Sequence, residues 1–116
     1  MATLSLTDIK QIEGDVVVVE VPEFGEGMTV NVHGLTVEQN TMLVRKLHAN
    51  PKTSSVPIVA ALAARDDNGN LVFGETEEEA IVLVGSLPSK YFPAVMRIFN
   101  VASDLMSSKP GAAEKN

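Results

Sequence analysis

Strand-forming residues dominate the stretch that follows the first thirteen positions. The run DVVVVEVP predicts a strand from Val16 to Val21, which Pro22 ends because proline cannot donate to a strand ladder. In MTVNVHGL, apolar and polar residues alternate with a period of two, which is typical of a half-buried strand. The intervening EFGEG contains two glycines. The sequence therefore predicts a β-hairpin with a loop of about five residues.

Two segments carry the start signal of a helix, followed by an apolar stripe. In TVEQNTMLVRKLHAN, Thr36 and Gln39 have capping-box spacing, and an Asn-Pro pair ends the predicted helix. In GETEEEAIVLVGSL, Thr76 and Glu79 have the same spacing, and glutamates in the first turn suit the positive end of the helix dipole. The residues expected to face the core are Leu35, Met42, Leu43 and Leu47 in the first helix, and Ala80, Ile81, Val84 and Leu87 in the second.

A third helix is predicted for SKYFPAVMRIFNVASDLMSS. Ser89 is the expected N-cap, and Pro93 falls in or near the first turn, where its missing N–H does little harm. Apolar residues recur at spacings of three and four, which gives one face of the helix to the core. This stripe comprises Val95, Ile98, Phe99, Ala102, Leu105 and Met106.

Between the first two predicted helices, IVAALAA (Ile58–Ala64) and LVF flank the polar stretch RDDNGN. This stretch has the composition of a calcium loop or of a hairpin turn. A calcium loop that starts at Asp66 needs glycine at its sixth place, where this chain has Leu71, and it needs helices on both sides. Asn-Gly between runs rich in Ile, Val and Phe favours a type I′ turn. We therefore expect a second β-hairpin here, with Ile58–Ala64 as its first strand.

The predicted order is strand, strand, helix, strand, strand, helix, helix. Two β-hairpins that form one antiparallel sheet, with about three helices packed on it, give an α+β fold. Residues 1–13 show little periodicity and are expected to form a flexible N-terminal lead. Residues 14–107 are expected to form a single domain, and the small, polar residues 108–116 a disordered tail.

The composition excludes several classes of function. The 116 residues include no cysteine, which rules out disulfides, cysteine-ligated zinc and a cysteine nucleophile. A net charge of −6 argues against nucleic-acid binding, which requires a basic face. The N-terminus lacks the apolar region of a secretory signal, and the longest apolar run is far too short to cross a membrane. Apolar residues nevertheless make up 45% of the chain, and an exposed apolar patch usually marks a partner-binding surface.

The chain has no Gly-rich phosphate loop, no HExxH and no GxSxG motif. His33 and His48 have no acidic or histidine neighbour at ligand spacing, so each is expected to be a strand-face or helix-end residue. The glutamates at 77–79 are interpreted as a solvated helix start rather than a metal site. We therefore expect no enzyme activity, no cofactor and no metal site.

The order of these features resembles the tail assembly chaperones of long-tailed (siphovirus-type) phages. The resemblance runs from about Val16 to Leu105. Its pieces are VEVPEFG, then VHGLTVEQN leading into a helix, then VAALAARDDNGNLVFGETEEEAIVLVGSLP, then AVMRIFNVASDL. The third piece is the most telling, because a strand, an acidic turn, an apolar LVF and a Thr-Glu-Glu helix start occur in this order in the family.

The resemblance implies an interaction protein. Members of the family bind the tape-measure protein in the host cytoplasm, keep it soluble, help to recruit tail-tube subunits and are absent from the mature virion. We further expect a homo-oligomer, with several copies along one tape-measure chain, and no nucleic-acid or membrane partner. Many members also have an extended form made by a ribosomal frameshift. Codons GAA AAA AAC for Glu114, Lys115 and Asn116 would contain a slippery run, so the tail is a candidate frameshift junction.

Tyr91, Phe92 and Met96 are the candidate contacts to the partner, because they begin the third helix partly off its apolar stripe. The alternative interpretation is that these three residues belong to the core. Two other functions remain open at this point. One is a small structural head–tail or tail-terminator protein of a phage virion, and the other is an acidic adaptor module.

Overall fold

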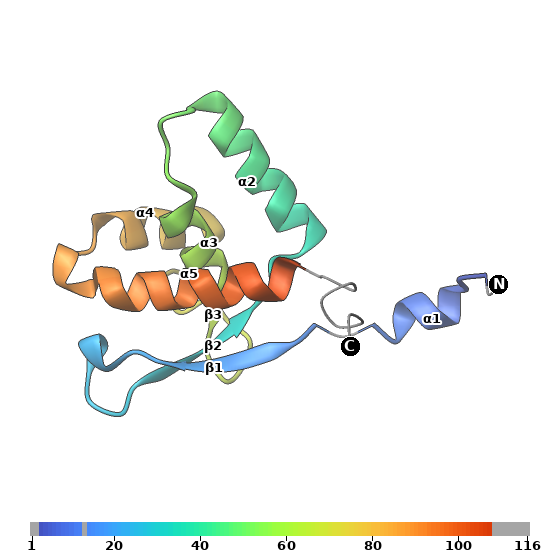
Figure 1. The fold of residues 1–116 in the computed structure, drawn as a ribbon, viewed down its shortest axis with the longest axis horizontal. Helices are drawn as coiled ribbons and strands as arrows, with labels where there is room; N and C mark the ends of the chain where they lie inside the picture. The colour runs from blue at the N-terminus through green and yellow to red at the C-terminus, as the bar shows by residue number, and fades with distance from the viewer. Residues whose placement is uncertain (1–2, 13, 108–116) are drawn as a thin grey trace, which may run out of the picture.

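A three-stranded antiparallel sheet lies along one side of the molecule, and helices cover one of its faces (Figure 1). The structure is a computed structural model that describes residues 3–12 and 14–107. The predicted α+β class is confirmed, although the described residues contain five α-helices rather than three. The elements are α1 (Leu6–Lys10), β1 (Val16–Glu20), η1 (Pro22–Phe24), β2 (Thr29–His33), α2 (Val37–Ala49), α3 (Ser55–Ala63), β3 (Ala64–Arg65), α4 (Glu77–Ser86), η2 (Ser89–Tyr91) and α5 (Phe92–Ser107).

The first predicted hairpin is confirmed as β1 and β2. Val17 pairs with Val32, and Val19 with Val30, so these valines share the face that the helices cover. Val30 and Val32 are buried there, as the alternating pattern predicted. The connection contains the 3₁₀ turn η1, and Gly27 has a φ of 79°, a backbone conformation that favours glycine. The period-two signal thus located the core face of the sheet.

The helix starts predicted at Thr36 and Thr76 are also confirmed, as the starts of α2 and α4. The Thr36 hydroxyl accepts the Gln39 backbone N–H at 3.1 Å, and the Gln39 side chain accepts the Thr36 N–H in return, which completes a capping box on α2. The Thr76 hydroxyl likewise accepts the Glu79 N–H at 3.2 Å and begins α4. Of the predicted stripes, Leu43 on α2 is buried, and α4 buries residues 80 and 84.

The prediction of a strand at Ile58–Ala64 is wrong. Residues 55–63 form helix α3, and only Ala64 and Arg65 pair with β2, as the two-residue strand β3. Every residue from Ile58 to Ala64 is buried, because α3 runs between α4, α5, α2 and the sheet (Figure 1). A helix that is buried on all sides has no polar face and therefore shows no helical period.

The turn predicted at RDDNGN is confirmed. The Asp66 N–H donates to the Asn70 carbonyl at 2.8 Å, and Gly69 has a φ of 84°. The Asp66 carboxylate accepts the backbone N–H groups of Asn68 and Asn70 at 2.8 and 2.9 Å, so it stabilises the turn itself. The second hairpin is short, because beyond the turn only Leu71 bridges back to Arg65.

Part of the N-terminal segment, for which the sequence predicted no regular element, forms a helix. Ser5 and Asp8 form a capping box that begins α1, yet α1 buries no residue and lies apart from the other helices (Figure 1). The last predicted helix is confirmed as α5, with Val95, Ile98 and Ala102 buried. It begins later than expected, because residues 89–91 form the 3₁₀ turn η2 before it. The predicted tail at 108–116 lies outside the described residues.

Candidate partner-binding surface

An apolar groove of about 430 Å³ opens where the start of α3, the end of α4 and the start of α5 meet. Its wall contains no charged side chain, and its only side-chain hydroxyls belong to two serines. A groove with these properties accepts apolar side chains of a partner better than a charged ligand. The lining residues are Ser54, Val56, Pro57, Val84, Gly85, Leu87, Pro88, Ser89, Phe92 and Val95.

The local sequence explains how these walls meet. The Ser54 hydroxyl accepts the Val56 N–H at 3.2 Å and begins α3, with Pro57 in the first turn, where its missing N–H is harmless. α4 ends before Pro88, whose extended backbone leads into η2 and then α5. Pro57 in the first turn of α3 and Pro88 between α4 and η2 therefore lie where the three helix ends meet.

The three candidate contact residues occupy different environments. Phe92 lines the groove, and 57% of its surface is exposed, although phenylalanine is among the residue types most often buried. Met96 is half-buried one helical turn later and does not line the groove. Tyr91 is also half-buried, and it packs against Phe24 and does not line the groove. The structure therefore brings only Phe92 to the groove.

Tyr91 belongs to an aromatic cluster. Its ring stacks on Phe24 with centroids 4.6 Å apart, and Phe24 in turn contacts Phe73 at 5.9 Å. The Lys90 ammonium lies 5.2 Å from the Tyr91 centroid, within cation–π range. The cluster fixes η2 against η1 and so holds the start of α5, and with it Phe92, in place.

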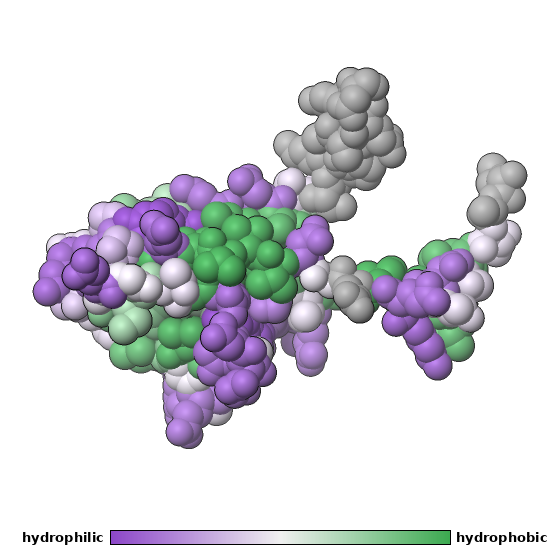
Figure 2. All heavy atoms as spheres, turned by 90° about the horizontal axis from the view of Figure 1, so that it is seen from below, coloured by the Kyte–Doolittle hydropathy of each residue, from purple (hydrophilic) through white to green (hydrophobic). Residues whose placement is uncertain are grey.

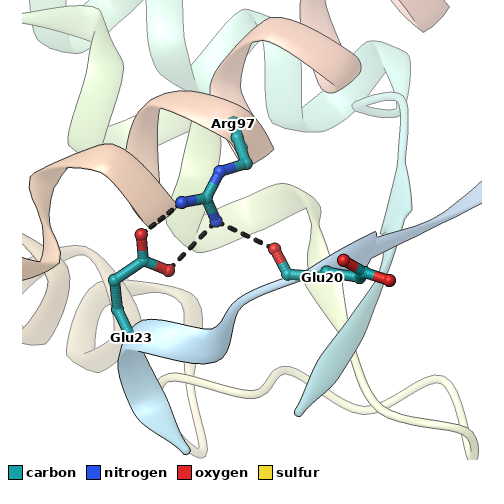
Figure 3. Close-up of polar contacts among 3 residues, drawn as sticks. All are labelled: Glu20, Glu23 and Arg97. Atoms are coloured by element: carbon teal, nitrogen blue, oxygen red, sulfur yellow. Dashed lines mark hydrogen bonds and ion pairs between the residues drawn. The ribbon is translucent and has the colours of Figure 1, made fainter. Parts of the chain in front are cut away.

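A second anchor holds the same region. The Arg97 guanidinium on α5 forms a two-pronged ion pair with the Glu23 carboxylate of η1 and donates to the Glu20 carbonyl at 2.9 Å (Figure 3). The hydrogen bond from Arg97 lowers the pKa of Glu23 below its usual value. The same bond raises the pKa of Arg97. These contacts fasten α5 to the end of β1.

The charged groups at the start of α4 all have structural partners. Glu77 accepts the Gln39 side-chain amide at 2.8 Å, and Glu78 forms an ion pair with Lys46 at 3.1 Å. Glu79 accepts the Glu75 backbone N–H. Among residues 3–12 and 14–107, no three His, Cys, Asp or Glu side chains are placed to hold a metal ion. The contacts of Glu77 with Gln39 and of Glu78 with Lys46 join α4 to α2.

A second apolar area lies on the sheet. Viewed from the sheet side, it appears as a hydrophobic region over β1 with hydrophilic residues around it (Figure 2). Val16 and Val18 point away from the helices, since they alternate with the buried Val19, and they are 49% and 62% exposed. These two valines form the outer face of β1.

The sequence identified Phe92 but missed the other walls of the groove. Val56 and Pro57 precede Ile58–Ala64, which was expected to be a strand, so they were not expected to meet Leu87 or Phe92. The signal that could have found them is Ser54-Ser55-Val56-Pro57, which has the N-cap residue and early proline of a helix start.

Comparison with protein-family models, curated proteins and solved structures finds no match for this chain. In the part of the chain that the structure describes, none of the helices is long and apolar enough to cross a bilayer.

Proposed function

We propose that this protein is a tail assembly chaperone of a long-tailed phage, which binds the tape-measure protein and keeps it soluble. The observation that carries the proposal is the uncharged apolar groove with the exposed Phe92 at its rim. A long helical partner with apolar side chains presents the chemistry that such a groove accepts, as in other helix-in-groove complexes. The ordered resemblance of the sequence to the family supports the same function.

In this proposal the groove takes one or two apolar side chains of the tape-measure helix, and Phe92 covers them. Each contact is weak, but many copies along one partner chain add avidity. The net charge of −6 on each copy keeps the loaded complex from aggregating. The complex forms in the host cytoplasm, and an extended form of the chain recruits tail-tube subunits before the chaperone leaves the tail.

The test is co-expression of this protein with a tape-measure fragment, and the readout is the soluble fraction of that fragment. Phe92→Asp is expected to lower the soluble fraction to the level seen without chaperone. The matched control is Val82→Asp, because Val82 is 69% exposed on α4 but lies outside the groove. Circular dichroism of both variants confirms that the fold persists.

Two results would count against the proposal. If Phe92→Asp and Val82→Asp keep the fragment equally soluble, the groove does not bind it. If mass spectrometry finds this chain in purified virions, the protein is a structural component of the head–tail or tail-terminator type. Binding of an unrelated partner with no effect on the tape-measure fragment would indicate an adaptor module.

A further inference from the structure

β1 is an edge strand with free hydrogen-bonding groups. In the sheet order β1-β2-β3, only one side of β1 is paired. The Val21 N–H donates to the Met28 carbonyl at 2.9 Å, so the backbone groups of Val21, Val19 and Val17 point toward β2. Those of the alternate residues, Val16, Val18 and Glu20, therefore point outward.

Of these three outward-pointing residues, only Glu20 has a hydrogen-bond partner for its backbone within the described part of the chain. Arg97 donates to the Glu20 carbonyl at 2.9 Å, which confirms that this backbone carbonyl points toward the unpaired edge of β1. Within the described part of the chain, no hydrogen bond to another element reaches the outward backbone groups of Val16 and Val18. An edge strand with unpaired N–H and C=O groups is a template for a further strand.

The same edge lacks the usual protection against strand addition. Proteins commonly place lysine, proline or a bulge on an edge strand, whereas residues 16–19 are four consecutive valines. Val16, Val17 and Val18 are 49%, 38% and 62% exposed. Unpaired backbone groups and exposed apolar side chains thus coincide at Val16 and Val18, with the exposed side chain of Val17 between them.

We propose that β1 of a second copy of this chain pairs antiparallel with this edge, around a two-fold axis at Val17. In this register Val16 lies opposite Val18 of the second copy, and the two residues exchange both backbone hydrogen bonds. The axis generates the same pair again. Every outward group of Val16 and Val18 is then satisfied, and the Arg97 contact with Glu20 stays intact.

The side chains and charges favour a second copy as the occupant. The register sets Glu20 opposite Gly14 of the second copy, and Asp15 opposite Val19, so no two carboxylates face each other directly. Val16 and Val18 of one copy lie beside Val18 and Val16 of the second copy. The four valines therefore pack together on the face of the joined sheet that the helices do not cover. A two-fold contact of this kind is self-complementary, because one patch serves both partners.

Pairing of this kind joins the two three-stranded sheets into one continuous sheet and leaves the groove of each copy at α3, α4 and α5. The inference does not depend on the proposed chaperone role. A dimer that forms without binding a tape-measure fragment supports the inference and not the function, and a monomer that solubilises the fragment does the reverse.

Cysteine cross-linking tests the register. The chain contains no cysteine, so each variant carries one thiol. In the proposed register, Val17 opposes its own counterpart as a non-hydrogen-bonded pair, with Cβ atoms about 4.5–5.5 Å apart, close enough for a disulfide after small adjustment. Val17→Cys is expected to give a disulfide-linked dimer under mild oxidation. Val18→Cys is expected to cross-link far less, because residue 18 is offset from its own counterpart.

The exposed α4 residue provides the matched control. Val82→Cys is expected to stay monomeric under the same oxidation, since Val82 is as exposed as Val18 but lies on another element. Equal cross-linking of Val17→Cys and Val82→Cys would mean random collision and would overturn the proposal. Preferential cross-linking of Val18→Cys would overturn the register.

The solution mass tests the interface without cross-linking. Sedimentation equilibrium of the unmodified full chain is expected to show a concentration-dependent species of twice the 12.4 kDa chain mass. Val18→Lys is expected to raise the dimer dissociation constant at least about tenfold, because both copies lose the cross-strand contact with Val16 and gain a charge next to the axis. Val82→Lys should leave it unchanged. A chain that stays monomeric at every concentration, or a Val18→Lys variant that dimerises normally, rejects the proposal. A monomeric chain whose tape-measure binding is lost in Val18→Lys would assign the edge to that partner instead.

Discussion

Arg97 and Glu23 lie 74 positions apart in the sequence, yet their side chains form a two-pronged ion pair. The same guanidinium donates to the Glu20 carbonyl at the end of β1 (Figure 3). One side chain on α5 therefore fastens both the last residue of the edge strand and the turn that follows it. This contact fixes the start of α5 relative to the sheet.

Removal of this contact is expected to lower the melting temperature. Arg97→Met keeps much of the aliphatic stem but leaves the Glu23 carboxylate and the Glu20 carbonyl without their donor. Lys46→Met is the matched control, because Lys46 pairs with Glu78 through a single contact at the surface. Thermal denaturation followed by circular dichroism should show a larger loss for Arg97→Met. Equal losses of melting temperature would mean that the contacts of Arg97 add nothing beyond an ordinary surface ion pair.

The stability of the protein should also depend on the ionisation of Glu23. The hydrogen bond from Arg97 lowers the pKa of Glu23 from 4.5, so the folded state favours the carboxylate. This stabilisation is fully present above pH 4.5 and is lost as the pH falls through the lowered pKa of the folded state. Urea midpoints between about pH 3 and pH 7 should therefore fall less steeply toward acid in Glu23→Gln than in the parent chain. Identical slopes in the two proteins would contradict the assignment.

The buried helix α3 should dominate the core energetically. Leu62 is 1% exposed between α4 and α5, and Leu62→Ala is expected to cost about 2–5 kcal/mol of unfolding free energy. Leu83 on α4 is 44% exposed, and Leu83→Ala should cost less than about 1 kcal/mol. Urea unfolding measures both. Similar values for the two variants would show that residues 55–63 do not form the central helix.

Two glycines should respond in opposite directions to the same change. Gly69 has a φ of +84° in the turn after β3, so Gly69→Ala is expected to destabilise the protein by about 1 kcal/mol. Gly85 lies in α4 with open space around its Cα, so Gly85→Ala should stabilise it by about 0.5–1 kcal/mol. Chemical denaturation measures the unfolding free energy of both variants. A change of the same sign in both would refute the turn geometry.

Residues with a local signal were placed correctly from the sequence. The capping pairs at Thr36 and Thr76 begin α2 and α4, and the Asn-Gly turn reverses the chain at Gly69. The groove was found only in part. Phe92 was a candidate because it begins an amphipathic helix, but Val56 and Leu87 were not, because their proximity depends on how three helix ends pack. The aromatic stacking of Tyr91 on Phe24 likewise follows from tertiary packing.

The sequence by itself determined the α+β class, the first hairpin, the starts of α2 and α4, and the tight turn. Each of these depends on interactions between residues that are close along the chain, such as caps, glycine conformations and the period of one exposed face. The tertiary structure decided that Ile58–Ala63 is a helix, that Arg97 meets Glu23 and that β1 is left as an open edge. A segment buried on every side has no polar face to reveal its period, and long-range neighbours leave no local trace in the pattern of residues.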